Sequence, residues 1–216
     1  MAIDTKERIL DAAEALFADQ GFSATSLRAI TTAAEANLAA VNYHFGSKEG
    51  LIEAVLARRL MPLNRERLDQ LDRLEGEAGD AGPDLEQVIE AFVGPPLRTR
   101  QDPTKGGAVF MRLLGHTIGQ PDDQIRQIFM RQFGEVVPRF TAALGRRMSG
   151  LTPSDVFWRF LFMVGSMAHT MAWSDQIPVV SDGLCDTTDA EATIRQFVPF
   201  VAAGMRSTAP AGKGTS

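Results

Sequence analysis

Five polar side chains that lie close together in the sequence carry the clearest chemistry of this chain: Arg28, Asn42, Tyr43, His44 and Lys48. Tyrosine, histidine and lysine side chains donate hydrogen bonds to phosphate oxygens, and an asparagine amide matches the edge of adenine in a bidentate pair. The stretch therefore predicts a nucleic-acid contact. In this contact Tyr43, His44 and Lys48 hold phosphates, while Arg28 and Asn42 read bases.

Two short helices joined by a tight turn must position these side chains. Thr25 or Ser26 caps the first helix and can hold a phosphate, and Asn37 caps the second helix. Within the second helix Val41 and Phe45 lie four residues apart on a face that packs, so the opposite face is free to contact DNA. The predicted DNA contacts are Thr25, Ser26, Arg28, Asn37, Leu38, Ala39, Ala40, Asn42, Tyr43, His44 and Lys48.

The stretch FSATSLRAITTAAEANLAAVNYHFGSK, with the helix before it, resembles the DNA-binding domain of TetR-family transcription regulators. The resemblance extends over residues 4 to 56 and includes the NYHFGSK run that ends the recognition helix. One departure is the tetrapeptide Asn37-Leu38-Ala39-Ala40, where members often carry Ser-x-Gly-Thr. Few groups therefore remain to hydrogen-bond bases. The three apolar side chains are expected to contact thymine methyl groups, and helix packing is the alternative for Leu38.

Composition by itself gives no nucleic-acid signal. The chain has 216 residues with 44% hydrophobic content and a net charge of -5, which allows a small head and a larger body. Residues 1–50 carry four basic and seven acidic side chains. Between Phe22 and Lys48, however, the only charges are Arg28, Glu35 and Lys48, so a locally positive face can form there.

The chain is expected to be a soluble, cytoplasmic, bacterial protein. Its single cysteine, Cys185, excludes an intrachain disulfide and a CxxC motif. The first ten residues carry charges where a signal peptide needs an apolar core. The longest apolar run, Phe160–Trp173, is too short to span a bilayer and contains His169.

The hydrophobic periodicity predicts an all-α fold of about nine helices with no strand and no repeat. A helix opens with Asp4 and Glu7 in a capping box, and a fourth helix from Ser47 to about Leu74 links head to body. Further helices are expected over 84–93, 108–118, 122–148 with a bend at Pro138, 152–173, and 189–206 interrupted by Pro199. The predicted domains are a head at 1–50, a body at 51–206 and a disordered tail at 207–216.

The arginines of the fourth helix alternate with acidic residues, so a solvated face is expected there rather than a second DNA patch. These are Arg58, Arg59, Arg65, Arg67 and Arg73. The last two helices carry more apolar surface than a small bundle covers, which predicts a homodimer. The expected interface residues are Met171, Ile194, Phe197, Val198, Val201 and Met205. The alternative is that these stripes only close the core of the body itself.

No catalytic motif is present, and the chain is not expected to be an enzyme. His116 and His169 lie on apolar helices, where a hydrogen-bonded histidine is expected rather than a metal ligand. No catalytic residue, metal site or cofactor is therefore predicted. A helical enzyme is the alternative from another class, and an adaptor or nucleoid-type protein without a ligand is a second.

Several pieces of the body are similar to the PsrA-like regulators, which respond to long-chain fatty acids: FMRLLG, GEVVPRF, FWRFLFMVG and FVPFVAAGMR. The resemblance implies a dimeric repressor of a palindromic operator, released by a long-chain fatty acid or its acyl-CoA. Another small hydrophobic effector is the alternative. Flexible apolar side chains suit an acyl tunnel. The expected ligand-binding residues are Phe110, Met111, Arg112, Leu114, His116, Phe129, Phe133, Phe157, Trp158, Arg159, Phe162, Met163 and Met167.

Overall fold

The computed structural model describes residues 4–101, 107–119 and 122–208, without the side chains of residues 100, 101, 108, 110, 114, 118 and 119. Within these residues every regular element is a helix, so the predicted all-α class is confirmed. The described part contains eleven α-helices and one short 3-10 helix, where about nine helices were expected. Most of the predicted disordered tail lies outside the described residues.

The chain divides into two compact units, and helix α4, Lys48–Ala78, contributes to both. The first unit is made of residues Met1–Asn64 and Asp102–Gly134. Its other helices are α1 Thr5–Gln20, α2 Leu27–Ala33, α3 Leu38–Phe45, α6 Gly107–Gly119 and α7 Asp123–Arg131. Because α6 packs on α1, this unit is larger than a head of residues 1–50. The predicted boundary at residue 50 marks the end of the expected DNA-binding function, whereas the compact units divide the chain elsewhere. The boundary stays a prediction.

Helix α1 organises the first unit. Asp4 caps the helix by accepting a hydrogen bond from the backbone N–H of Lys6. Ile9, Ala13 and Phe17 are fully buried, as expected for the inner side of an amphipathic helix. Phe17 also contacts Phe22, with ring centroids 5.2 Å apart, where the chain leaves the helix. This core supports α2 and α3, which both pack on α1.

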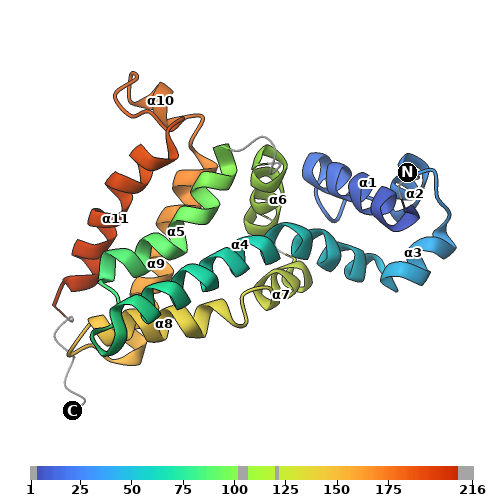
Figure 1. Cartoon of the computed structure of the whole chain (residues 1–216). Helices are drawn as coiled ribbons and strands as arrows, with labels where there is room; N and C mark the ends of the chain where they lie inside the picture. The colour runs from blue at the N-terminus through green and yellow to red at the C-terminus, as the bar shows by residue number, and fades with distance from the viewer. Residues whose placement is uncertain (1–3, 102–106, 120–121, 209–216) are drawn as a thin grey trace, which may run out of the picture. The chain divides into compact units, whose positions relative to one another are not determined.

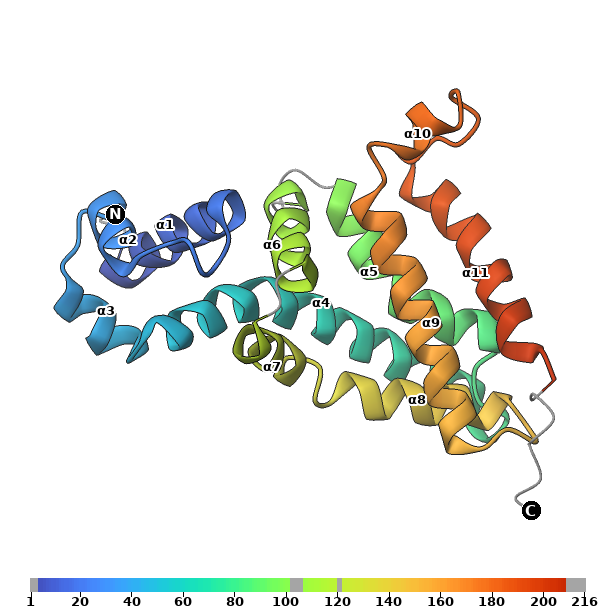
Figure 2. The same ribbon diagram turned by 180° about the vertical axis from the view of Figure 1, so that it is seen from behind.

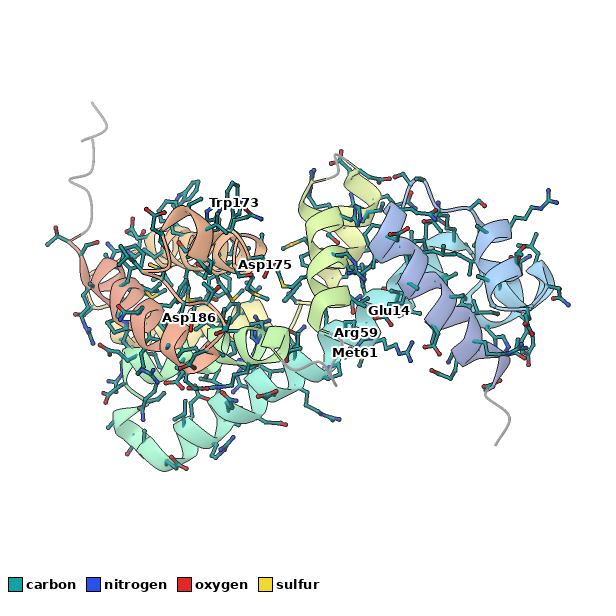
Figure 3. The ribbon with its side chains drawn as sticks, turned by 90° about the horizontal axis from the view of Figure 1, so that it is seen from above. Glu14, Arg59, Met61, Trp173, Asp175 and Asp186 are labelled. Atoms are coloured by element: carbon teal, nitrogen blue, oxygen red, sulfur yellow. The ribbon has the colours of Figure 1, made fainter. Side chains whose placement is uncertain are left out.

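An ion-pair network joins α1 to the first half of α4. Glu14 is 4% exposed, and the side chain of Arg59 reaches its carboxylate (Figure 3). Arg58 also forms an ion pair with this carboxylate, at 3.4 Å. Arg58 also lies 2.6 Å from a carboxylate oxygen of Asp11. Arg58 is exposed and Arg59 half-buried, and both brace the two helices. Arg65 and Arg73 are exposed, as expected of a solvated face. The expectation is wrong for Arg67, which is only 3% exposed.

The second unit contains residues Arg65–Gln101 and Glu135–Ser216. After α4 its elements are the 3-10 helix Gly79–Ala81, α5 Leu85–Gln101, α8 Val136–Arg147, α9 Pro153–Ala172, α10 Ile177–Val180 and α11 Ala190–Arg206. Helix α5 packs on α8, α9 and α11, and it runs alongside α11 in both ribbon views (Figures 1 and 2). At the centre of this unit the Phe92 ring lies 5.1 Å from each of the rings of Phe140 and Phe160.

Prolines affect the helices differently from what was expected. Helix α5 continues through Pro95 and Pro96, and α11 continues through Pro199. The long helix expected over 122–148 is instead two helices, α7 and α8, and Pro138 lies in the first turn of α8. A proline is tolerated there because a first-turn N–H has no intrahelical acceptor. The break and the short α10 account for the additional helices.

Candidate nucleic-acid interface

In the turn between α2 and α3, the residue that follows the C-cap of α2 has a left-handed backbone conformation. The N–H of Ala36 donates to the carbonyl of Thr31 at 2.9 Å, and the N–H of Glu35 donates to that of Thr32 at 3.2 Å. This is a Schellman arrangement, which usually places glycine in the left-handed position. Here Glu35 occupies it with a φ of 48°. Because no glycine marks the turn, its geometry was not visible in the sequence.

Helix α3 has one buried and one exposed side, as its periodicity predicted. Asn37 caps it, with its side-chain oxygen accepting from the N–H of Ala40 at 2.8 Å. Val41 is fully buried, whereas Leu38 and Tyr43 are 52% and 85% exposed. Asn42 lies exposed beside them. The helix therefore presents an apolar side chain, an amide and a phenol to solvent.

The junction between α3 and α4 depends on two glycines that sequence reasoning did not single out. Gly46 has a φ of 77°, a conformation that favours glycine. At Gly50 a Cβ atom would lie 2.0 Å from the carbonyl oxygen of Phe45, so only glycine fits there. The close approach fixes the start of α4, where the Lys48 ammonium donates to the carbonyl of Ser23 at 3.5 Å. The GSKEG run was the signal for this junction.

One predicted DNA contact is corrected by the structure. Thr25 is fully buried, and its hydroxyl donates to the carbonyl of Gly21 at 2.7 Å. The cap of α2 is Ser26, whose hydroxyl oxygen accepts from the N–H of Ala29 at 3.1 Å. Thr25 is therefore structural. The remaining predicted contacts are exposed or half-buried: Ser26, Arg28, Asn37, Leu38, Ala39, Ala40, Asn42, Tyr43, His44 and Lys48.

The predicted ligand residues are divided between the two units. Met111, Arg112 and His116 lie on α6, and Phe129 contacts Phe133 at the end of α7, with centroids 5.1 Å apart. The other described members belong to α9, in the second unit. The side chains of Phe110 and Leu114 lie outside the described residues. Neither unit by itself brings the set together.

Three of the predicted ligand residues on α9 are not enclosed by this chain. Phe157, Trp158 and Phe162 are 47%, 57% and 65% exposed, so they do not line a tunnel within their own unit. The guanidinium of Arg159 is hydrogen-bonded at the end of α11, where it donates to the backbone carbonyl of Met205. Met163 and Met167, on the opposite side, are buried in the core. These aromatic residues are therefore removed from the ligand set.

The cavities found in the second unit have different linings. One of about 380 Å³ lies between α4 and α5 and is lined mainly by polar side chains, including Arg73, Glu77 and Arg98. Another of about 590 Å³ surrounds the loop after α4 and includes Arg146 and Arg147. Neither cavity is lined by a predicted ligand residue. Their lining does not suit an alkyl chain.

The predicted dimer residues are also corrected. All six are only 2% to 7% exposed in the single chain: Met171, Ile194, Phe197, Val198, Val201 and Met205. They lie within the second unit, where α11 packs on α5 and α9. A side chain that its own chain already covers cannot form the contact between two copies. These six side chains therefore close the core of the body, as the alternative described.

An apolar surface remains uncovered on α9. Phe157, Trp158, Leu161 and Phe162 are each more than 40% exposed, and the rings of Trp158 and Phe162 stack with centroids 5.9 Å apart. On α11 Phe200 is 71% exposed. We call these five residues the α9/α11 face. Large exposed apolar side chains that adjoin one another, as Trp158 and Phe162 do, typically mark an interaction surface.

Among the residues described, no helix is long and apolar enough to cross a membrane. The same residues contain no group of three or more histidine, cysteine or acidic side chains placed to hold a metal ion. The side chain of Cys185 is exposed.

The helix-turn-helix of α2 and α3, followed by an all-α body, defines a class of DNA-binding regulators. Family models agree with this assignment. The model for bacterial regulatory proteins of the tetR family matches residues 9–55, and a tetracyclin repressor-like C-terminal domain matches residues 90–204, more than half of the chain. The chain therefore belongs to the TetR family and is a DNA-binding transcriptional regulator. Members of this family are not enzymes, so the prediction against an enzyme is confirmed.

Individual relatives agree at the level of the motif and the fold. The probable HTH-type transcriptional regulator YttP of Bacillus subtilis is 40% identical over 57 residues, which cover 26% of this chain and 28% of that protein. The fatty acid degradation regulator FadR from Bacillus halodurans superposes with a TM-score of 0.65 at 15% identity, covering 96% of this chain and all of that one. At such identity the likeness shows the fold alone.

Two further solved structures share this fold. The TetR-family regulator PfmR from Thermus thermophilus has a TM-score of 0.60 at 19% identity, covering 90% of this chain and 96% of that one. FadR from Bacillus subtilis, in complex with stearoyl-CoA, has a TM-score of 0.60 at 15% identity, covering 92% and 98% of the two chains.

Proposed function

We propose that the protein is a homodimeric repressor that binds a palindromic operator and is released by a long-chain fatty acid or its acyl-CoA. The observation that carries the dimer is the α9/α11 face, because a second copy is the simplest partner for it. A two-fold axis would pair α9 and α11 of both subunits in a four-helix interface. Two recognition helices separated by one DNA turn, roughly 34–36 Å, then read two half-sites.

Helix α3 is proposed to enter the major groove. Its exposed Asn42 reads adenine, and Leu38, Ala39 and Ala40 contact thymine methyl groups. Tyr43, His44, Lys48 and the cap residue Ser26 hold phosphates, which set orientation rather than sequence preference. Such contacts make affinity depend on salt. Arg28, exposed on α2, is the second polar candidate for a base.

Two substitutions test this assignment. Lys48→Ala should weaken binding to all sequences and lower the slope of log affinity against log salt by about one unit. Asn42→Ala should cost about 1–3 kcal/mol on the specific operator and little on random DNA. Arg65→Ala, exposed on the second half of α4, is the matched control. An unchanged salt slope in the first variant, together with unchanged sequence preference in the second, would refute the assignment.

The fatty-acid part of the proposal is supported by the PsrA-like pieces of the body and by two fold relatives. One is a regulator of fatty acid degradation, and another was solved with stearoyl-CoA. In this chain Met111 on α6, Phe129 on α7 and Phe133, which follows α7, remain described apolar candidates. Each buried methylene of an acyl chain contributes about 0.8 kcal/mol, so tight binding needs few polar contacts. Arg112 and His116 are the candidates for its polar end.

The effector is tested by titrating the protein and operator complex with oleate and oleoyl-CoA below their micelle concentrations. A short-chain acid serves as the control. We expect displacement by a long-chain compound, with a rise in the melting temperature of the free protein, because a ligand that binds the native state stabilises it. If neither compound displaces DNA or shifts the melting temperature, another hydrophobic effector becomes the better proposal. The DNA-binding assignment would stand in that case.

A further inference from the structure

Helix α5 contains an acceptor that its own backbone cannot satisfy. In an α-helix the N–H of residue 96 would donate to the carbonyl of residue 92. Residue 96 is Pro96, which has no N–H, and α5 nevertheless continues to Gln101. The carbonyl of Phe92 is therefore left without its usual intrahelical donor. A buried carbonyl in this position needs a donor from elsewhere.

Arg67, on α4, provides this donor. Its Nε donates to the Phe92 carbonyl at 2.8 Å, and its guanidinium carbon lies 4.1 Å from the centroid of the Phe92 ring. Arg67 is 3% exposed, and burial lowers the pKa of its guanidinium to about 9. Burying this charge has a free-energy cost. A leucine, like Leu63 and Leu71 on the same buried side of α4, would avoid that cost but would offer no donor.

Phe92 places this contact at the centre of the second unit. Its ring also packs against Phe140 of α8 and Phe160 of α9, each with centroids 5.1 Å apart. A change in the position of α5 therefore acts on the guanidinium through both the carbonyl and the ring. Arg67 belongs to α4, the continuous helix that begins at Lys48 directly after the recognition helix.

We infer that Arg67 is a positioning residue that supplies the hydrogen bond Pro96 cannot make, and that through this bond a displacement of α5 is passed to α4 and changes operator affinity. The inference rests on the proposed function, because it requires that binding of the effector displaces α5. The competing explanation is that Arg67 only stabilises the fold. The two explanations differ in what happens when the missing backbone donor is restored.

A double-mutant cycle in urea unfolding tests the structural half of the inference. Arg67→Met keeps an unbranched side chain but replaces the guanidinium with an apolar group and leaves the Phe92 carbonyl without a donor, so the folding equilibrium constant should fall at least about tenfold. Pro96→Ala restores the backbone N–H. In that background Arg67→Met should change the constant by less than about threefold, a departure from additivity expected only for coupled residues. Arg73→Met, exposed on α4, should change neither background.

The functional half is tested by releasing operator DNA with oleoyl-CoA. The wild-type protein and Pro96→Ala should respond alike, because a carbonyl accepts two hydrogen bonds and Arg67 keeps its contact. The Arg67→Met/Pro96→Ala double variant regains stability but has lost the hydrogen bond between α4 and the Phe92 carbonyl of α5. It should bind the operator within about threefold of wild type, yet need at least about ten times more oleoyl-CoA for half release. Arg67→Lys, which keeps a donor and the charge, should fall between them.

Each outcome decides a different point. Additive stabilities in the cycle would show that Arg67 does not replace the donor of residue 96 and would overturn the inference. A double variant that releases DNA like wild type would also overturn it, because Arg67 would then be structural only. If the wild-type protein itself ignores oleoyl-CoA, the effector proposal fails, and the unfolding cycle still decides whether Arg67 and Pro96 are coupled.

Discussion

Helices α9 and α11 both carry long apolar stripes, but the chain covers them differently. On α11 the stripe that includes Phe197 and Val201 is buried against α5. Helix α9 buries Phe160 and Met163 on one side and leaves Trp158 and Phe162 exposed on another. An apolar stripe thus shows that a helix face needs a partner. Whether its own chain or a second copy provides that partner depends on the neighbouring helices.

The strongest test of this difference is a charge on the covered stripe. Val201→Glu places an unpaired carboxylate where the native side chain is 7% exposed. The expected cost is about 3–5 kcal/mol, a large part of the stability of a small protein. The variant should lose helical circular dichroism or aggregate. A folded, helical monomer would contradict the assignment of this stripe to the chain's own core.

A charge on the uncovered face should have a different effect. Phe162→Glu leaves the core intact, so the protein should keep its helical content and sediment as a monomer. Because two linked heads bind a palindrome far more tightly than one, operator affinity should fall by a factor on the order of 100. Met61→Glu, at a residue 64% exposed on α4 (Figure 3), is the matched control and should remain dimeric. A dimeric Phe162→Glu protein would exclude this face.

The same contrast between covered and uncovered side chains occurs at neighbouring positions of the DNA-binding motif. Thr25→Val removes a buried donor from the Gly21 carbonyl and should cost about 1–3 kcal/mol in urea unfolding, with no change in the salt slope of DNA binding. Ser26→Ala removes the cap of α2 and should cost about 1 kcal/mol. It should also lower the salt slope, because Ser26 is a proposed phosphate contact. A changed slope in Thr25→Val would restore that residue as a contact.

The smallest effect concerns the charges that attach α11 to α5. Hydrogen bonds from Arg206 hold the pKa of Glu86 below its usual value, and those from Arg98 do the same for Glu191. A carboxyl with a lowered native pKa contributes stability at neutral pH and loses it as the pH falls below 4.5. Both pairs are largely exposed, so the contribution is small.

The Glu86→Gln/Glu191→Gln variant measures that contribution. It should be slightly less stable than wild type at pH 7, and the difference should shrink toward pH 3. An equal difference in stability at pH 7 and pH 3 would show that the stabilisation does not depend on ionisation of the two carboxyl groups. The dimer proposed through the apolar α9/α11 face should not change with these substitutions, which sedimentation can check.

Much of the DNA-binding motif could be predicted because its determinants are local. Ser26 and Asn37 cap helices through bonds to backbone groups three residues away, and Val41 is buried because of its phase on a short helix. Local rules did not separate Thr25 from Ser26, since both residue types suit a cap. Nor did they find the turn at Glu35, where a non-glycine residue adopts a left-handed conformation.

The sequence by itself determined the all-α class, the caps and the amphipathic stripes, because hydrogen bonding and helical phase involve residues only a few positions apart. Tertiary structure decided what covers each stripe, since that depends on helices distant in the chain. It placed Val201 in the core and Phe162 at the surface. Tertiary structure also provided a hydrogen-bond donor for the Phe92 carbonyl, which Pro96 leaves without one in α5. This donor is Arg67, 25 residues earlier in the chain.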